Sequence, residues 1–349
     1  MDAAYVSARP RLAIDGETRA DLGSALRALT VNRPAHGMAH AELHLVFWGA
    51  ADDDPGPSYR FLDVAPGAAL MVAFGQDTPV EVFSGEVTAI EERYGGGAPR
   101  LVLLAQDRLH RLARQRRSRT FDDQSLDAVI SAIAADAGLG ADANVSAVSA
   151  TWHQLNESDL GFLLRLLAPF GAALRLDGES LRARAEAPDP EPIALDTNDN
   201  ALDVRLIADL ARQPGEVRVS GFDPAVDEDL QASATTGTSP GSGQSAADVL
   251  GGLGWPALEP LARPFPWRQG LADGFAQGQF DRRAHGFVAG AIRCVGDPAL
   301  APGREVELTG VTPRLAGRYR VVHCAHRFDA ADGYRSHLRV ERADLGGAT

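Results

Sequence analysis

The stretch Pro302-Gly303-Arg304-Glu305-Val306-Glu307-Leu308 opens the segment that decides the fold. A connection with a glycine, Leu315-Ala316-Gly317, leads into the run from Arg318 to Phe328. The turn Ala331-Asp332-Gly333 then opens the run from Tyr334 to Glu341. Apolar and polar residues alternate in all three runs, and proline and glycine bound them. This pattern predicts three strands in an antiparallel meander.

The same order of turn, strand, glycine and strand occurs far upstream. Pro66-Gly67 precedes Ala69–Val72, and Phe83-Ser84-Gly85 precedes Glu86–Ile90. A pattern that appears once in each half of the chain predicts an internal duplication. We therefore expect an α+β fold, mainly β, with two duplicated barrel-like antiparallel domains and a small inserted α/β segment.

Composition shifts divide the 349 residues into five predicted regions. Residues 186–192 are rich in proline and acids and indicate a boundary. Ala232–Ser245 is rich in Ser, Thr and Gly and predicts a flexible loop. The regions are a first barrel-like domain at 1–110, a helical connector and compact α/β insert at 111–187, a second barrel-like domain formed by 188–231 and 286–342, an inserted loop and helix region at 232–285, and a tail at 343–349.

Charge and hydropathy exclude several classes of function. The 34 basic and 47 acidic residues give a formal charge of −13. Stable nucleic-acid binding is therefore not expected, because it rests on cationic contacts. No apolar run reaches the roughly 18 residues of a membrane span, and no signal-peptide pattern opens the chain. We expect synthesis and assembly in the cytoplasm, with no membrane insertion by this chain.

Six arginines are clustered between Asp107 and Arg119. Leu109, Leu112 and Ala113 lie at helical spacing, so the segment predicts a short amphipathic helix. Its basic face is either solvated or a contact for an acidic partner. The arginines are Arg108, Arg111, Arg114, Arg116, Arg117 and Arg119.

The α/β insert has recognisable helix boundaries. Ser125 can cap a helix that Gly138 ends. Asn156–Asp159 fits a capping box before a leucine-rich helix that Gly171 ends. A further helix is predicted within Phe275–Ala291.

A zinc site is the first chemistry to weigh. Cys324 and His326 share one face of the predicted strand, while His323 points to the other face. Even with Cys294 the set falls short of the usual three or four ligands. The sequence favours buried cysteines and a hydrogen-bonded histidine, so no metal or cofactor is predicted.

Catalytic patterns are equally weak. The acid groups Glu91-Glu92 and Asp227-Glu228-Asp229 could imitate glycosidase carboxylates, but adjacent acids in turns are usually solvated. The glycines of Tyr94–Pro99 precede a strand, whereas phosphate-binding loops precede a helix. No catalytic residue is predicted, and the chain is not expected to be an enzyme.

Several short motifs, taken in order along nearly the whole chain, resemble one family. They are Phe83-Ser84-Gly85-Glu86-Val87; Thr120-Phe121 leading to Ala137-Gly138-Leu139; Trp152-His153-Gln154 with Asn156–Leu163; Val217–Gly221; Pro302-Gly303; Gly317-Arg318-Tyr319; His326-Arg327-Phe328; and Gly333-Tyr334-Arg335. The chain resembles the baseplate hub proteins of contractile phage tails (the late control gene D group) and their relatives in contractile injection systems. The N-terminal half of type VI secretion spike proteins is similar. Trp152 and the Ser/Gly loop at 232–245 depart from the family pattern.

The resemblance implies a structural hub. Such a protein forms a homotrimeric ring of six tube domains that adapts a six-fold inner tube to a three-fold spike. Two copies in each of three subunits give that symmetry. The implied partners are other copies of the chain, inner tube proteins, baseplate wedge proteins, a spike, and cargo in the lumen. The finished protein would lie within the baseplate of a virion or injection particle.

Two further expectations concern the end of the chain and an alternative function. Because only seven residues follow the last strand, we expect the spike to be a separate chain and 343–349 to be a tether. The alternative function is a peptidoglycan-directed hydrolase or wall-binding module in the segment 120–185. A wall-binding module would fold and bind alone, whereas a hub insert would not.

Overall fold

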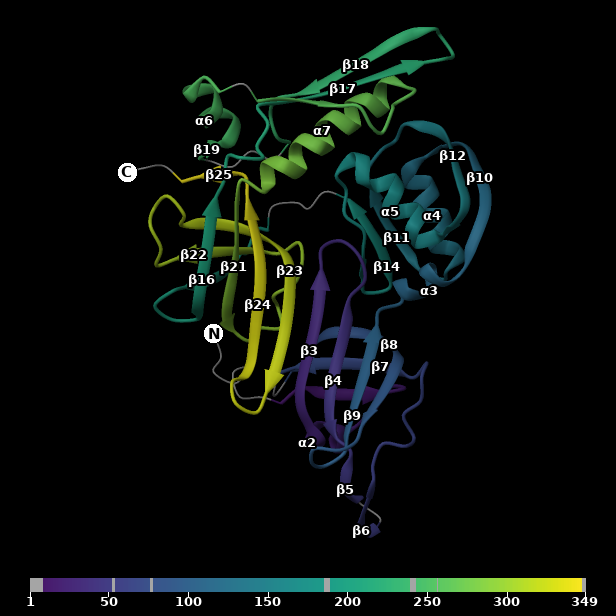
Figure 1. The fold of residues 1–349 in the computed structure, drawn as a ribbon, viewed down its shortest axis with the longest axis vertical. Helices are drawn as coiled ribbons and strands as arrows, with labels where there is room; N and C mark the ends of the chain where they lie inside the picture. The colour runs from purple at the N-terminus through teal and green to yellow at the C-terminus, as the bar shows by residue number, and fades with distance from the viewer. Residues whose placement is uncertain are drawn as a thin grey trace.

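The structure is a computed structural model that describes residues 9–51, 54–75, 78–184, 189–238, 243–255 and 257–346. It is mainly β, and most of its strands belong to one large sheet (Figure 1). The predicted fold class is confirmed. Within the described ranges, no helix is long and apolar enough to cross a membrane.

The first half of the chain forms seven strands of the large sheet, in the pairing order β3-β4-β9-β8-β7-β1-β2. A separate hairpin of β5 and β6 extends from it. The elements are β1 (Arg11–Ile14), β2 (Glu17–Thr18), α2 (Ala20–Ala25), β3 (Leu26–Pro34), β4 (His40–Val46), β5 (Trp48–Ala51), β6 (Asp54–Tyr59), β7 (Ala69–Phe74), β8 (Val80–Arg93) and β9 (Arg100–Gln106).

The predicted strand break at Gly85 is wrong. Gly85 lies inside β8, which is continuous over fourteen residues. A Cβ atom there would lie 2.3 Å from the carbonyl oxygen of Gln106 on β9. The glycine therefore permits close approach of the neighbouring strand and does not mark a connection.

The second half adds six strands. β16, β21, β24 and β23 pair in that order, and β22 pairs with both β23 and β15. The meander of β22, β23 and β24 confirms the pattern on which the fold prediction rests. The elements are β15 (Ile193–Asp196), β16 (Ala201–Ala208), β21 (Val288–Val295), β22 (Glu305–Thr309), β23 (Gly317–Asp329) and β24 (Gly333–Arg342).

A direct strand pair joins the two halves. β3 lies antiparallel to β23, from Ala28 opposite Asp329 to Pro34 opposite His323. The described residues thus form one open thirteen-stranded sheet, and the two halves are not separate closed barrels. Phe328 and Tyr334 of the second half complete the hydrophobic core of the first.

The connector lies between the halves in sequence and to one side of them in space (Figure 1). The predicted helix of 107–119 is shorter than expected, since α3 ends at Arg114 and Arg116 begins a strand. The elements are α3 (Leu109–Arg114), β10 (Arg116–Ser125), α4 (Leu126–Asp136), β11 (Gly140–Asn144), β12 (Ser149–Ser158), α5 (Asp159–Leu167), a 3-10 turn η1 (Ala168–Phe170), β13 (Arg175–Asp177) and β14 (Ser180–Arg184).

Two serines cap the connector helices. The Ser125 hydroxyl accepts a hydrogen bond from the backbone N–H of Ala128, as predicted. The predicted capping box at Asn156–Asp159 is wrong, because Ser158 caps α5 and accepts from the N–H of Gly161. The N-cap oxygen must reach the N–H of the second or third helical residue. Ser158, the last residue of β12, lies at that spacing from the first free N–H groups, whereas Asn156 lies two residues too early.

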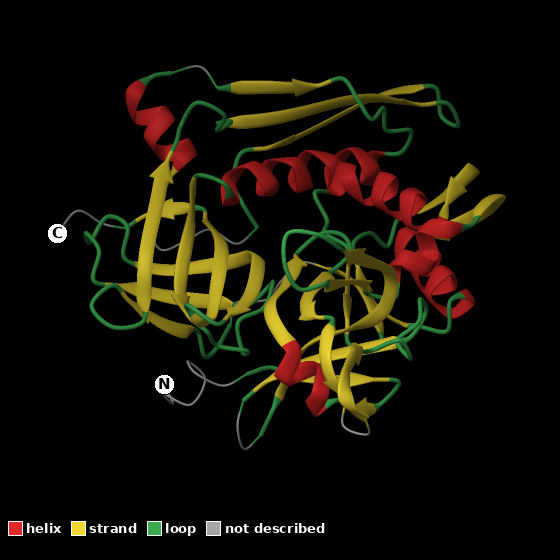
Figure 2. Ribbon diagram, turned by 60° about the horizontal axis from the view of Figure 1, so that its bottom comes forward, coloured by secondary structure: helices red, strands yellow, loops and turns green. Residues whose placement is uncertain are grey.

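The second insert packs against the connector. Helix α7 runs beneath the sheet of β17, β18 and β20 (Figure 2). It covers Gln269–His285, so the helix predicted within Phe275–Ala291 begins earlier and ends before β21. The remaining elements are β17 (Glu216–Asp223), β18 (Glu228–Ala234), β19 (Gln244–Ser245), α6 (Ala246–Leu253), β20 (Leu258–Leu261) and β25 (Asp344–Leu345).

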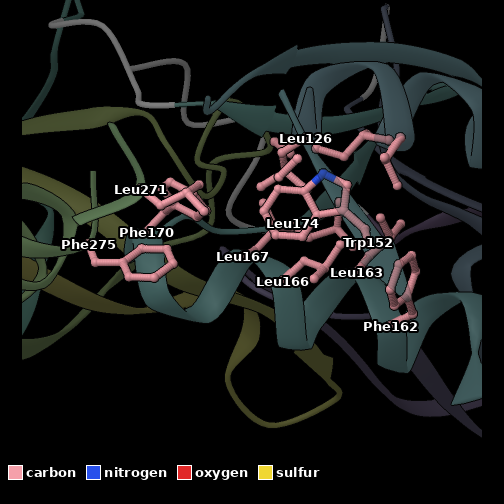
Figure 3. Packing of buried hydrophobic residues seen from close by; sticks show 14 of the residues in the cluster. Leu126, Trp152, Phe162, Leu163, Leu166, Leu167, Phe170, Leu174, Leu271 and Phe275 are labelled. Carbon is pink, nitrogen blue, oxygen red and sulfur yellow. The ribbon is translucent and has the colours of Figure 1, made fainter. Parts of the chain in front are cut away.

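One hydrophobic core serves both inserts. Leu167 and Phe170 of the connector lie in the same cluster as Leu271 and Phe275 of α7 (Figure 3). The rings of Phe170 and Phe275 meet edge to face at 4.9 Å. The regions 111–187 and 232–285, separate in the sequence prediction, therefore pack as one body.

The chain end and the Ser/Gly-rich segment both contribute residues to strands. β25 pairs with β19, and Asp344 is buried and bonded to Arg342 at 2.7 Å, so the predicted tether is wrong for these residues. Of the predicted loop 232–245, the first residues belong to β18 and the last to β19. Residues 239–242 lie outside the described residues.

Candidate assembly surface

The two Pro-Gly turns make the same backbone contacts. The N–H of Gly67 donates to the carbonyl of Val87 at 2.7 Å, and the N–H of Gly303 donates to the carbonyl of Val321 at 2.9 Å. In return, the N–H of each valine donates to the residue after its glycine, at 2.9 Å in both halves. The turns are thus equivalent in structure as well as in sequence.

Two pairs of register shifts also occupy equivalent positions. The ladders β8·β9 and β23·β24 each shift directly after the turn-bonded valine. The ladders β3·β4 and β16·β21 shift near the start of their first strand. The shifts lie between Val87 and Ala89, between Val321 and His323, between Leu26 and Ala28, and between Ala201 and Asp203. Bulges are specific local features, so their repetition indicates a true duplication.

The pairing order makes the correspondence complete over five strands. β3-β4-β9-β8-β7 of the first copy matches β16-β21-β24-β23-β22 of the second. The copies differ at the far end, where β1 joins β7 antiparallel but β15 joins β22 in parallel. The internal duplication predicted from the sequence is therefore present in the strand pairing.

The strand pair β3·β23 is a tightly packed junction between the copies. Leu29 lies opposite Phe328, and Val31 lies opposite His326. All four side chains are at most 5% exposed. The junction is thus an internal seam with a dry face.

A group of aromatic rings fills this seam. The Nδ1 atom of His326 lies 2.8 Å from the Tyr334 hydroxyl. The Tyr334 ring stacks on Phe74 of the first copy, with 3.7 Å between ring centroids. Burial lowers the pKa of His326 to about 3. The imidazole is therefore neutral at physiological pH.

The equivalent edge of the second copy is open. On β16, the N–H of Asp209 donates to Phe287 in the inner ladder. Hydrogen bonding alternates along an antiparallel strand, so Val204, Leu206 and Ala208 direct their N–H and C=O groups outward. Within the described residues no strand pairs with this edge.

The part of β8 that matches the covered part of β23 is open too. β7 pairs with residues 80–86 of β8, and β9 pairs with 86–93 on the opposite side. Beyond Val87, no described strand covers the β7 side of β8. The equivalent part of β23, residues 323–329, is the one that β3 covers. The chain therefore has one occupied seam and two unoccupied strand edges that match its two sides.

The candidate metal ligands do not assemble into a site. The Sγ atom of Cys324 lies 3.4 Å from Nε2 of His326, and Cys294 contacts the Ser336 carbonyl at 3.5 Å. His323 lies on the other face of the strand, as predicted. Within the described residues no group of three or more potential ligands is close enough to hold a metal. Burial raises the pKa of Cys294 to about 12, so this thiol stays protonated and is a poor ligand.

Four of the six arginines of 108–119 form ion pairs within the chain, namely Arg108, Arg111, Arg117 and Arg119. Arg108 pairs with Glu179 at 2.8 Å, and Arg111 pairs with Glu86. Arg119 pairs with Asp136 at 2.7 Å. These arginines hold the connector together, so the basic face is not simply solvated.

The candidate acid pairs do not converge. Glu91 and Glu92 are neighbours on β8 and so point to opposite faces; Glu91 pairs with Arg93 at 2.7 Å. Asp227 and Glu228 lie at the turn between β17 and β18 and are exposed. Neither group forms a pair of facing carboxylates.

Sequence analysis missed a buried polar network in the connector. The Asp159 carboxylate accepts from Arg119 at 2.8 Å and from Gln154 at 2.9 Å, and the Gln154 carbonyl accepts from Arg119 at 2.8 Å. Gln154 and Asp159 are nearly fully buried. Both lie in motifs noted in the sequence, but nothing there indicated that Arg119 would reach them from β10.

Comparison with known proteins places the chain in a family. The family model described as the Alg8 N-terminal domain matches residues 11–329. The chain belongs to this family. The match to the Alg8 N-terminal domain spans the first copy of the duplicated sheet, both inserts, and the second copy as far as the end of β23. A search of curated proteins finds no match.

Solved structures share the fold of this Alg8 N-terminal domain protein at low sequence identity. A 43 kDa tail protein of prophage MuSo2 from Shewanella oneidensis is 15% identical, with a TM-score of 0.70 over 97% of this chain and 100% of that chain. A tail protein from Neisseria meningitidis is 11% identical, with a TM-score of 0.68 over 96% of each chain. The Escherichia coli c3393 protein, described as a type VI secretion component similar to bacteriophage T4 gp27 and gp5, is 10% identical, with a TM-score of 0.61 over 97% and 79%.

Proposed function

We propose that this protein is a structural hub in the baseplate of a contractile tail-like injection particle. In this role it forms a homotrimeric ring between the six-fold inner tube and a three-fold spike. The observation that carries the proposal is the duplication, because three chains with two equivalent sheet copies each present six similar units. The shared fold of tail and secretion proteins supports it.

The proposed division of the chain follows that role. The two copies of the sheet, near 9–106 and near 193–208 with 286–342, are the ring-forming units. The connector and the second insert, which share one core, form an appendage on the ring. We propose that this appendage contacts baseplate wedge proteins, and that the ring contacts the inner tube on one side and a separate spike chain on the other.

The polar face of the sheet is the proposed lining of the lumen. It lies opposite the two cores and carries charges of both signs, such as Arg293 opposite Asp203. Arg327 and Arg335 lie opposite one another on the same face. Because Arg327 and Arg335 carry the same charge, this part of the face attracts a passing anion more strongly than the mixed part does. We propose that cargo passes along this face.

A structural role accounts for the residues better than catalysis does. The candidate ligands are buried or half-buried and form no metal-binding group among the described residues, and the candidate acids are exposed or bonded within the chain. The alternative, a peptidoglycan-directed module at 120–185, conflicts with the core that this segment shares with α7. Incubation of the full chain with purified cell-wall sacculi tests that alternative, and we expect no co-sedimentation and no release of wall fragments.

The main experiment places the chain in its particle. A particle carrying a tagged chain is imaged by electron microscopy, and the tag is expected at the junction of tube and spike. Deletion of the chain is expected to yield tubes without spikes. A tag along the sheath or the fibres, or normal spiked particles after deletion, would exclude a hub.

A further inference from the structure

The occupied seam inside the chain predicts how separate chains meet. It joins one edge of the first copy, β3, to one edge of the second copy, β23. The duplicate of β3 is β16, and the duplicate of β23 is β8. Both duplicates have the corresponding edge open.

The shared ladders set the expected register. In the first copy, successive cross-strand partners connect the turn-bonded Val87 to Val31. In the second copy, the equivalent partners connect Val321 to Leu206. The paths are Val87–Ala105–Ala41–Val31 and Val321–Val340–Gly290–Leu206. On the other side of the seam, His326 follows Val321 by five residues, as Glu92 follows Val87.

We propose that β16 of one chain pairs antiparallel with residues 89–94 of β8 in a second copy of this chain, with Leu206 opposite Glu92. In this register Ala208 lies opposite Ile90, and Val204 lies opposite Tyr94. These residues correspond to the hydrogen-bonded partners of the internal seam. The proposal rests on the proposed function and names the contact that closes its ring.

The two edges need a partner of this kind. β16 is an eight-residue strand without proline, and its Leu202 and Ile207 are 43% and 49% exposed. The whole sequence contains no lysine, the residue that most often protects free edges. Tyr94 is 58% exposed beside the other edge. Such edges are templates for pairing with another chain.

Head-to-tail pairing also explains why assembly stops. Each chain has one open β16 edge and one open β8 edge, so the contact is heterologous and forms a closed ring when the rotation closes. The like-charged pair Arg205 and Arg93 is then opposed across the seam. Both side chains are exposed, so water and salt screen their repulsion.

Disulfide trapping in the assembled particle tests the register. Ile207 and Glu91 correspond to Asn32 and Ala325, which lie opposite one another in the internal seam without mutual hydrogen bonds. Such pairs have Cα atoms about 4.5 Å apart, within the range of a disulfide. The test protein carries Ile207→Cys and Glu91→Cys. Both native cysteines are buried and do not compete.

Two controls match this variant. Asn32→Cys with Ala325→Cys is expected to form the same bond within one chain. Asp203→Cys with Glu91→Cys places the cysteines four residues out of register, on the same strands and the same face. It is expected not to cross-link.

The expected result is a ladder of covalent oligomers for Ile207→Cys with Glu91→Cys on non-reducing gels, lost on reduction. Co-expression of the two single variants is expected to give a covalent dimer. Cross-linking of the out-of-register control, or no cross-link in particles that contain the chain, would overturn the seam and leave the hub intact. If the chain is absent from particles, the hub proposal fails, and the same variants in the concentrated purified chain still decide the seam.

Discussion

The covered edge of β3 and the open edge of β16 are duplicates in different surroundings. Leu29 and Val31 of β3 are at most 1% exposed, whereas Val204 and Leu206 of β16 are only half-buried. Across the seam, Phe328 is 5% exposed and its counterpart Tyr94 is 58% exposed. The strand pairing around them is the same, so the difference lies in whether a partner strand is present.

The side chains reflect this difference. The permanent seam uses apolar rings and a neutral histidine, since no water reaches them. The open edge uses Glu92 and Tyr94, which bond to one another and tolerate water. An edge that must wait for its partner benefits from polar residues that keep the free chain soluble.

The largest expected effect compares the two aromatic counterparts. Phe328→Ala removes a buried ring and should lower the free energy of unfolding by about 3–5 kcal/mol. Tyr94→Ala removes an exposed ring and should change it by less than about 0.5 kcal/mol. Urea titration of the isolated chain measures both. Equal losses would mean that the two positions are not in different surroundings.

A second expected effect is the pH dependence of the free energy of unfolding that the buried His326 causes. Burial lowers the pKa of His326 to about 3, so the folded chain resists the proton that the unfolded chain binds below its ordinary value of 6.5. With respect to His326, the folded chain therefore has its full stability above pH 6.5, and the free energy of unfolding decreases as the pH falls from 6.5 toward 3. Between pH 7 and pH 5 the loss should be about 2 kcal/mol.

The variant His326→Gln isolates the pH-dependent loss of stability that His326 causes, because glutamine can still form a hydrogen bond with Tyr334 but does not titrate. The difference in unfolding free energy between pH 7 and pH 5 should shrink by that amount. Burial raises the pKa of Asp107 to about 6, an effect of opposite sign that cancels between variants. An unchanged slope in His326→Gln would contradict the neutral, buried imidazole.

The sequence predicted the sheet where local signals were strong. Pro302-Gly303 and Pro66-Gly67 marked true equivalent turns, and alternation located most strands. The strand break predicted at Gly85 was wrong, because the sequence does not distinguish a glycine within a strand from a glycine in a turn. Only the position of the Gln106 carbonyl on the neighbouring strand explains this glycine. Arg116 and Arg119 were assigned to a helix, since strand pairing with β12 is a long-range contact that periodicity does not reveal.

Local sequence patterns do not predict the candidate assembly surface. Nothing in Leu26–Pro34 or Ala201–Ala208 distinguishes a covered strand from an open one, because that depends on β23, over a hundred residues further along the chain. The seam between His326 and Val31 is likewise non-local. The prediction of a buried cysteine and a hydrogen-bonded histidine is confirmed for Cys324 and His326, which alternation alone placed on one face.

The smallest expected effect on folding is at the open edge. The N–H of Leu206 points outward, so Leu206→Pro removes no hydrogen bond of the free chain, and proline is tolerated on edge strands. We expect a change of about 1 kcal/mol or less in unfolding, but loss of oligomers. Leu206→Ala keeps the N–H and should retain them. Light scattering measures the loss of oligomers, and urea titration measures the change in the free energy of unfolding, for both variants. If Leu206→Pro strongly destabilised the free chain, this edge would already be paired.

The account depends most directly on the number of chains in the ring. Native mass spectrometry of the hub complex released from tagged particles measures that number. We predict three copies of this chain, which supply six copies of the duplicated sheet. Six copies of the chain, or a single copy bound to other proteins, would contradict the account.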